Sequence, residues 1–154
     1  AAIDELQHHY AWIIFTSSNS VTFFCDRLYQ RGLDAQPAMA AIGEDLDRAT
    51  RGRFDEQVSP SGAPWEPLSE AYRQRKPRRQ DEILVLNGYL RDTNRYNAGP
   101  DYLEYGTDRI YGASMHFGDE ERGIPERNWL GFSSDDEANA IETLLDYLGE
   151  PLGE

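Results

Sequence analysis

A long amphipathic helix between Pro37 and Val58 constrains this chain more than any other segment. Proline suits the first turn of a helix, because its missing N–H would have no intrahelical partner there. Apolar residues then recur at helical spacing and predict one buried face: Met39, Ile42, Leu46, Ala49 and Phe54. The opposite side carries charged residues: Arg48, Arg51, Asp55 and Glu56. Residues 59–64 contain two prolines and one glycine and predict a loop, which Trp65 and Leu68 are expected to attach to the core.

A strand followed by a helix is predicted before this long helix. Trp12–Phe15 is a short apolar run that suits a buried strand. A helix then begins at Ser18 or Ser20, whose hydroxyl can accept a hydrogen bond from the first turn, and continues to about Arg31. Its apolar face is expected at Val21, Phe24 and Leu28. Gly32 follows directly and suits the left-handed residue that ends many helices.

The middle of the chain alternates short elements with turns. Ser69 is expected to cap a short helix over Glu70–Arg75, and Pro77 ends that helix. Ile83–Leu86 is interpreted as a buried strand. The elements after it are, in order, a turn at Asn87-Gly88, a helical turn over Tyr89–Asp92, a hairpin of strands near Thr93–Asn97 and Tyr102–Tyr105, and a helix over Ile110–Phe117.

The last predicted helix is capped by Ser134 and ends near Leu148, before Gly149 and Pro151. Acidic residues in its first turn complement the positive end of the helix dipole: Asp135, Asp136 and Glu137. Its apolar stripe is expected at Ala138, Ile141, Leu144, Leu145 and Leu148. The sequence therefore predicts a single α+β domain over residues 1–154. In it, a small, mostly antiparallel sheet is packed by the long helix and the C-terminal helix.

Charge is divided unevenly along this acidic chain. The net charge is −13, yet five basic residues lie close together: Arg73, Arg75, Lys76, Arg78 and Arg79. The segment from Asp119 to Glu154 contains eleven acidic residues and two arginines, which gives it a net charge of −9. Residues 73–82 are predicted to be a mobile basic arm, because Arg73–Gln80 contains no apolar anchor. The arm can be a solvated loop, contact an acidic face of a neighbouring subunit, or contact DNA, although an acidic protein is a poor duplex binder.

Three aromatic residues are candidates for a subunit interface: Trp65, Tyr111 and Trp129. Tyrosine and tryptophan are favoured at interfaces because they bury a large area at a low cost in side-chain entropy. The same side chains suit a small core equally well, and the sequence leaves both alternatives open.

No pattern in the chain indicates catalysis, a cofactor or a metal. His8 and His9 are adjacent, whereas two histidines that bind one metal ion from a helix prefer i, i+4 spacing. His116 is not accompanied by a serine or cysteine in a known nucleophile motif. Cys25, the single cysteine, suits a small buried hydrophobe in a reducing cytoplasm, and the glycines form no phosphate-binding loop. No apolar run approaches the ~20 residues of a membrane span, and the polar start is unlike a signal peptide. We therefore expect a non-enzymatic protein that does not span a membrane.

Ordered sequence blocks extend from Pro37 to Leu148. They are the Ala-Ile-Gly-Glu start of the long helix; Pro60, Gly62, Trp65, Pro67, Leu68 and Ser69; Leu84, Gly88, Leu90, Arg91 and Asp92; Gly106, Thr107, Asp108, Ile110 and Tyr111; Phe117-Gly118; and Ile124, Pro125, Arg127, Leu130 and Gly131. In this order the blocks resemble the phage virion morphogenesis family, which contains the Mu-type and P2-type tail-completion proteins. The departures from the family pattern are Thr93 for serine, Gly112 for alanine, and Asn128-Trp129 for proline and phenylalanine.

The resemblance implies a non-enzymatic virion protein that completes the tail or joins it to the head. Such proteins resemble ring-forming neck proteins, built from a small sheet packed by helices. The implied partners are further copies in a ring, neighbouring tail and head-connector proteins, and DNA in the channel. The implied location is the virion neck or tail, reached from the host cytoplasm during assembly. A ring needs two complementary faces, which the basic arm and the acidic C-terminal part would supply.

A second resemblance concerns the N-terminal residues. Trp12–Phe24 and Gly32–Ala35 resemble a strand, turn and helix of uroporphyrinogen-III synthase, with Ser20 in place of a glycine. This similarity spans about residues 11–43, whereas the synthase is a longer, two-domain enzyme whose cleft needs more than one strand and one helix. It leaves the origin of residues 1–36 open. An enzyme fragment and a DNA-contacting assembly factor are thus the alternatives to a structural role.

Overall fold

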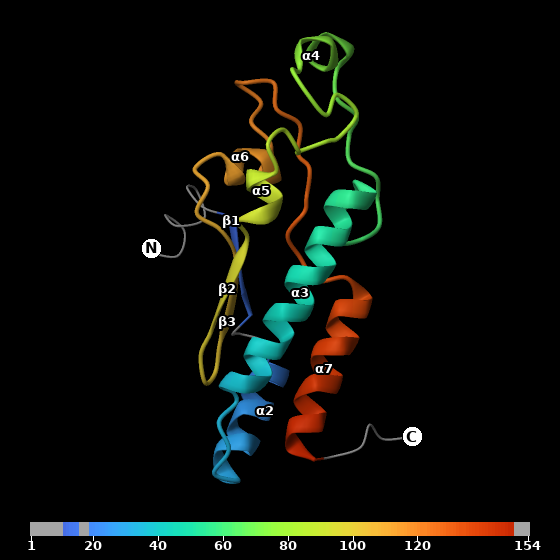
Figure 1. The fold of residues 1–154 in the computed structure, drawn as a ribbon. Coiled ribbons are helices and arrows are strands. Elements are labelled where there is room, and N and C mark those ends of the chain that lie inside the picture. The colour runs from blue at the N-terminus through green and yellow to red at the C-terminus, as the bar shows by residue number, and fades with distance from the viewer. Residues whose placement is uncertain (1–10, 16–18, 150–154) are drawn as a thin grey trace.

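The predicted long helix is α3 (Gln36–Glu56), with Pro37 in its first turn. The computed structural model describes the backbone of residues 11–15 and 19–149, and the side chains of residues 25–149. In it, α3 lies between a small sheet and the C-terminal helix α7 (Ser134–Leu148) and contacts both (Figure 1). The predicted α+β class, with a small antiparallel sheet packed by the long helix, is therefore confirmed, and the C-terminal helix packs on the other side of that long helix.

Three antiparallel strands form the sheet in the order β1-β3-β2: β1 (Ala11–Phe15), β2 (Arg95–Ala98) and β3 (Leu103–Thr107). Ile13 of β1 and Tyr96 of β2 both pair with Tyr105 in the central strand. The N–H of Gly99 donates to the Tyr102 carbonyl at 2.9 Å and closes the β2–β3 hairpin. The predicted first strand and hairpin are thus confirmed, with hairpin strands displaced by one or two residues.

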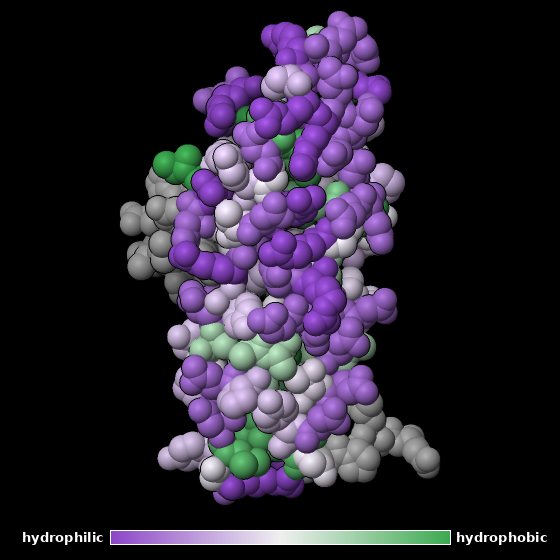
Figure 2. Space-filling model, viewed as in Figure 1, coloured by the Kyte–Doolittle hydropathy of each residue, from purple (hydrophilic) through white to green (hydrophobic). Residues whose placement is uncertain are grey.

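The sheet attaches to α3 through two tyrosines. Gly43 makes the approach possible, since a Cβ at this position would lie 2.5 Å from the Tyr96 ring. The Tyr96 hydroxyl donates to Glu44 at 2.7 Å, and the Tyr105 hydroxyl donates to Asp47 at 3.0 Å. The predicted charged side of α3 is exposed, and this face is mostly hydrophilic in Figure 2.

Two hydrophobic clusters form the core. The first joins α2 (Asn19–Gln30), the start of α3, and α7, and contains Cys25, Leu28, Ala35, Ala38, Met39, Ile42, Leu103, Ala140, Leu144 and Leu148. The second lies under the opposite end of α3 and contains Leu46, Phe54, Trp65, Ile83, Val85, Leu90, Tyr105, Trp129 and Leu130. Predicted core residue Ala49 is only half-buried, because Thr50 and Arg53 face the interior instead.

The helix α2 ends as predicted. Gly32 has a φ of 71°, and the N–H of Leu33 donates to the carbonyl of Leu28 at 2.9 Å. This is the left-handed ending that glycine favours. Leu28 is buried, as expected. Ser18 and the side chains of Val21 and Phe24 lie outside the part that the structure describes, as do His8, His9 and Pro151.

The start and the apolar face of α7 differ from the prediction. Ser133, not Ser134, is the N-cap, and its hydroxyl accepts from the N–H of Asp136 at 3.1 Å while Asp136 accepts from Ser133 at 2.8 Å. The buried residues of α7 are Ala140, Leu144 and Leu148. Ala138 and Ile141 are exposed and Leu145 is half-buried, so the apolar face of this helix is wider than the surface that the protomer covers.

The short predicted helices are present as α4 (Glu70–Arg75), α5 (Tyr89–Asp92) and α6 (Gly112–Phe117), the last starting later than expected. The predicted strand at Ile83–Leu86 is wrong: these described residues form a turn, in which Leu84 has a φ of 60°. Its apolar pattern has another cause. Ile83 and Val85 are buried in the second cluster, although no described strand pairs with this segment.

Candidate functional site

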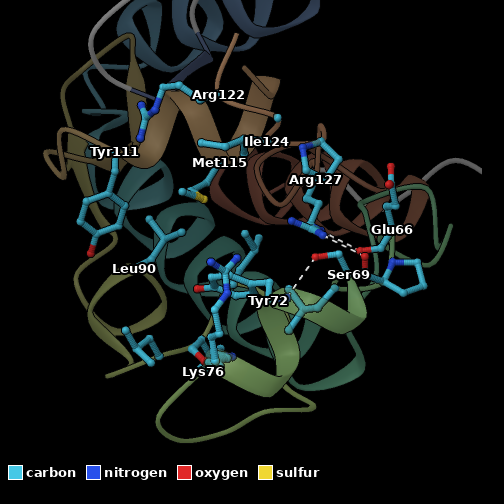
Figure 3. A pocket seen from close by; sticks show the side chains of 18 of the residues that line it. Glu66, Ser69, Tyr72, Lys76, Leu90, Tyr111, Met115, Arg122, Ile124 and Arg127 are labelled. Atoms are coloured by element: carbon cyan, nitrogen blue, oxygen red, sulfur yellow. Dashed lines mark hydrogen bonds between the residues drawn. The ribbon is translucent and has the colours of Figure 1, made fainter. Parts of the chain in front are cut away.

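A groove of about 700 Å³ opens at the end of the molecule that carries α4, α5 and α6 (Figures 1 and 3). Three segments line it: residues 66–76, 84–90 and 111–127. Each contributes to one or more of the sequence blocks that suggested the family. The fold therefore brings separate motif blocks to one place.

The walls of the groove are largely apolar and aromatic. Figure 3 shows Leu90, Met115 and Ile124 on one side, near Tyr111, and Tyr72 of α4 in the middle of the view. Tyr72 is substantially exposed, as are Leu86 and Tyr89, which also line the groove. The groove therefore offers accessible apolar area, which is typical of a surface that binds a protein segment.

The groove is positively charged in an otherwise acidic protein. Four basic residues and one acidic residue line it, a net of +3: Arg75, Lys76, Arg122, Arg127 and Glu66. The whole chain carries −13. Opposite charges steer partners toward one another, so this contrast favours an acidic partner for the groove.

Lys76 holds the irregular backbone beside the groove. Its side chain is buried, and Nζ donates to the carbonyl oxygens of Arg79, Glu82 and Val85 at 2.5 to 2.7 Å. Burial lowers the pKa of Lys76, because desolvation disfavours the charged form. Lys76 is one of the five candidates for contact with DNA or a neighbouring subunit, but in the protomer its charged end is buried and directed to backbone carbonyls. Lys76 thus anchors residues 79–85, although no apolar residue of the basic stretch could do so.

The four arginines of the basic stretch (73–82) remain on the surface: Arg73, Arg75, Arg78 and Arg79. Arg73 forms an ion pair with Asp81, and Arg79 lies 3.7 Å from Glu82. These contacts reduce the positive charge that the stretch presents outward. The mobility expected for this stretch stays a prediction.

Arg127 fastens the loop before α4. Its guanidinium donates to the Glu66 carbonyl at 2.7 Å and to the Pro67 carbonyl at 3.2 Å, as Figure 3 shows. Trp65 Nε1 donates to the Asn128 carbonyl at 2.7 Å. Burial lowers the pKa of Arg127, because the guanidinium is removed from water. The loop around Trp65 and the segment around Arg127 therefore form one wall of the groove.

The predicted interface aromatics separate into two groups. Trp65 and Trp129 are 4% and 0% exposed, and their ring centroids lie 5.3 and 5.7 Å from that of Phe54. Both side chains complete the core of the protomer, which is one of the two alternatives that the sequence leaves open. Tyr111 is half-buried and lines the groove, so it keeps surface for a partner.

His116 and Cys25 are both buried in the protein interior. Nδ1 of His116 accepts from the Trp129 N–H at 3.3 Å, and burial lowers the pKa of His116 to about 4. Cys25 is buried, and desolvation raises the pKa of its thiol. Among the described residues, no group of three or more His, Cys, Asp or Glu side chains is placed to hold a metal ion. No described helix combines the length and the apolar character needed to cross a membrane.

A comparison with protein-family models supplies the identity. The model described as the phage virion morphogenesis family matches residues 17–149, which include every described helix and the β2–β3 hairpin, together with the groove. Neither the curated proteins nor the solved structures yield a match. Because the family model spans most of its length, this chain belongs to the phage virion morphogenesis family.

Proposed function

We propose that this phage virion protein completes the tail or joins it to the head as a subunit of a ring. Membership of the virion morphogenesis family carries the proposal, because it makes the chain a structural component of a phage particle. The same membership agrees with the expectation of a non-enzymatic protein. The proposed partners are further copies of the chain and the tail and head-connector proteins next to it.

Two oppositely charged surfaces support assembly into a ring. The groove presents the exposed guanidinium groups of Arg75 and Arg122, with Lys76 and Arg127 buried behind its surface, whereas α7 contains five acidic residues and no basic one. Surfaces that differ in charge suit a heterologous interface, in which one face of a subunit meets another face of the next. Such contacts generate a closed ring when the rotation between neighbours closes.

The assembly state of the purified protein tests the ring directly. Light scattering across a concentration series is expected to show a discrete multiple of the 17.6 kDa chain mass. In phage lysates that lack the protein, we expect heads and tails that fail to join, or tails that stay incomplete. Normal joined particles in its absence would contradict the proposal.

Contact with DNA is the second candidate, because four arginines of the basic stretch are exposed. Two of them pair with Asp81 and Glu82, which weakens this alternative. Counterion release makes phosphate binding strongly salt-dependent. DNA binding at low salt that disappears on neutralising Arg73, Arg75, Arg78 and Arg79 would favour a DNA-contacting assembly factor over a purely protein-binding subunit.

A further inference from the structure

The helix α7 has an apolar strip that its own protomer leaves uncovered. Ala138 is exposed, Ile141 is 46% exposed and Leu145 is half-buried. With 3.6 residues per turn, these three positions fall within about 60° of one another around the helix axis. Their i, i+3, i+7 spacing is the pattern by which an amphipathic helix anchors itself in a groove.

Acidic residues border this strip. Exposed carboxylates occur along the length of the helix: Asp135, Glu137, Glu142 and Asp146. The fifth acid, Asp136, is half-buried and already engaged, because it accepts from Ser133 and forms an ion pair with Arg53. The exposed strip therefore combines apolar anchors with a strongly negative border.

The groove has the complementary character. Its apolar walls include Leu90, Met115 and Ile124, and its exposed basic residues are Arg75 and Arg122. Arg122 also lies 3.5 Å from a carboxylate oxygen of Asp119 in an exposed pair, which is weak enough to exchange for a new partner. A volume of about 700 Å³ is large enough to take several side chains, since binding pockets commonly measure ~300–1,000 Å³. The groove thus matches the strip of α7 in both apolarity and charge.

We propose that the exposed strip of α7 in one copy of the chain docks in the groove of the next copy. This inference rests on the proposed ring and assigns the contact that builds it. Ile141 meets the apolar wall, while Glu142 and Asp146 lie toward the guanidinium groups of Arg75 and Arg122. The charged pairs at the border chiefly orient the subunits, and the apolar anchors supply the affinity.

The two surfaces lie on different parts of one protomer. The groove is beside α4, α5 and α6, whereas α7 runs along α3 toward the opposite end of the molecule (Figure 1). One subunit can therefore use its groove and its α7 at the same time, as a heterologous interface requires.

A mixing experiment with two full-length variants tests this contact. Ile141→Asp removes the helix anchor and leaves the groove, whereas Tyr72→Asp impairs the groove and leaves the helix. Each variant alone is expected to lose at least tenfold in self-association, measured by light scattering. Mixed together, they are expected to form a one-to-one pair that grows no further, because the mixture contains one intact groove and one intact helix per pair.

Matched controls exclude a general effect of a surface aspartate. Ile110→Asp and Tyr29→Asp replace exposed residues that do not line the groove, and both are expected to assemble like the wild type. Circular dichroism confirms that each variant is folded. The charge exchange of Arg122→Glu with Glu142→Arg in one chain is expected to recover assembly that either single reversal weakens.

The outcomes separate the contact from the ring. If the wild type forms rings, and the Ile141→Asp and Tyr72→Asp variants form rings of the same stability, the α7–groove contact is wrong and the proposed ring stands. A wild type that is monomeric at the highest soluble concentration contradicts the ring and the contact together.

Discussion

Two regions of the molecule hydrogen-bond their backbone N–H and C=O groups in different ways. One is the helical framework (α2, α3, α7 and the sheet), and the other is the groove end (residues 65–90 and 111–131). In the framework, helix and strand hydrogen bonds follow regular sequence patterns. In the groove end, long irregular segments are held by buried cations, with Lys76 and Arg127 donating to five carbonyl oxygens. Backbone carbonyls that no regular element pairs still need donors, and long basic side chains provide several at once.

This difference has a consequence for binding. A surface built from irregular segments can present a groove, because its side chains are not committed to a regular packing face. The framework supplies the rigid support and, through α7, a second surface.

The largest effect is expected for the buried ion pair of the framework. Arg53 joins α3 to α7 by pairing with Asp136 and donating to the Gly131 carbonyl at 2.8 Å. Arg53→Ala leaves that carboxylate buried without its cation and is expected to lower the free energy of unfolding by about 3–5 kcal/mol. Urea denaturation measures the change. The exposed pair of Arg48 and Asp45 is the control, and Arg48→Ala should cost less than about 1 kcal/mol.

The next prediction separates the covered face of α7 from the uncovered one. Leu144 is fully buried, so Leu144→Ala is expected to destabilise the monomer by about 2–5 kcal/mol. Ile141→Ala should leave monomer stability within about 0.5 kcal/mol, since surface substitutions away from special features have small effects. Equal losses measured by thermal unfolding under monomeric conditions would show that the protomer covers both faces.

A pH-dependent contribution is expected at His116 of the groove end, whose ring packs edge-on against Trp129 of the second hydrophobic cluster. The pKa of this imidazole is about 4 in the folded chain and 6.5 ordinarily, so the unfolded chain binds its proton more tightly. The contribution is therefore fully present above pH 6.5 and is lost as pH falls toward 4, amounting to about 3 kcal/mol.

The matched variant for this test is His116→Asn, whose side-chain oxygen can still accept from the Trp129 N–H. Unfolding free energies are compared at intervals from pH 7.5 down to 4. The wild type is expected to lose more stability than the variant across this range. Parallel pH curves for the two proteins would remove His116 as the cause.

The smallest effect on global stability is expected in the groove end. Lys76→Met keeps the length of the side chain but leaves three carbonyls without their donor. Only the bond to the Val85 carbonyl is buried, because water can reach the other two, so the cost is expected to be that of one unsatisfied buried acceptor, about 1–3 kcal/mol. Hydrogen exchange is expected to accelerate in residues 76–90, while protection in α3 and α7 stays unchanged. Uniform acceleration across all of these segments would show that the groove end and the framework unfold as one unit, which removes the contrast between them.

The framework could largely be predicted from the sequence. Pro37, the helical spacing from Met39 to Phe54, and the Gly99-Pro100 turn act locally, so they specify α3 and the hairpin without knowledge of distant residues. The family resemblance likewise depended on ordered local blocks, and the family-model match bears it out.

The errors fall where distant contacts override a local pattern. Ile83–Leu86 has the composition of a strand, yet it packs as an irregular segment in the second cluster. Lys76 belongs to a run of basic residues, yet its charge is directed inward to three carbonyls. The buried face of α7 was expected to include Ala138 and Ile141, which are exposed. Periodicity shows that a helix face is apolar but not how much of that face a neighbouring element covers.

The sequence by itself determined the α+β class, the positions of the main helices, the uneven charge and the family, because each of these is written in local spacing or composition. The tertiary structure alone decided that Trp65 and Trp129 are core residues, that Lys76 is buried, and that separate blocks converge on one groove. Burial and convergence depend on which distant segments pack together, and a single chain's spacing does not encode that directly.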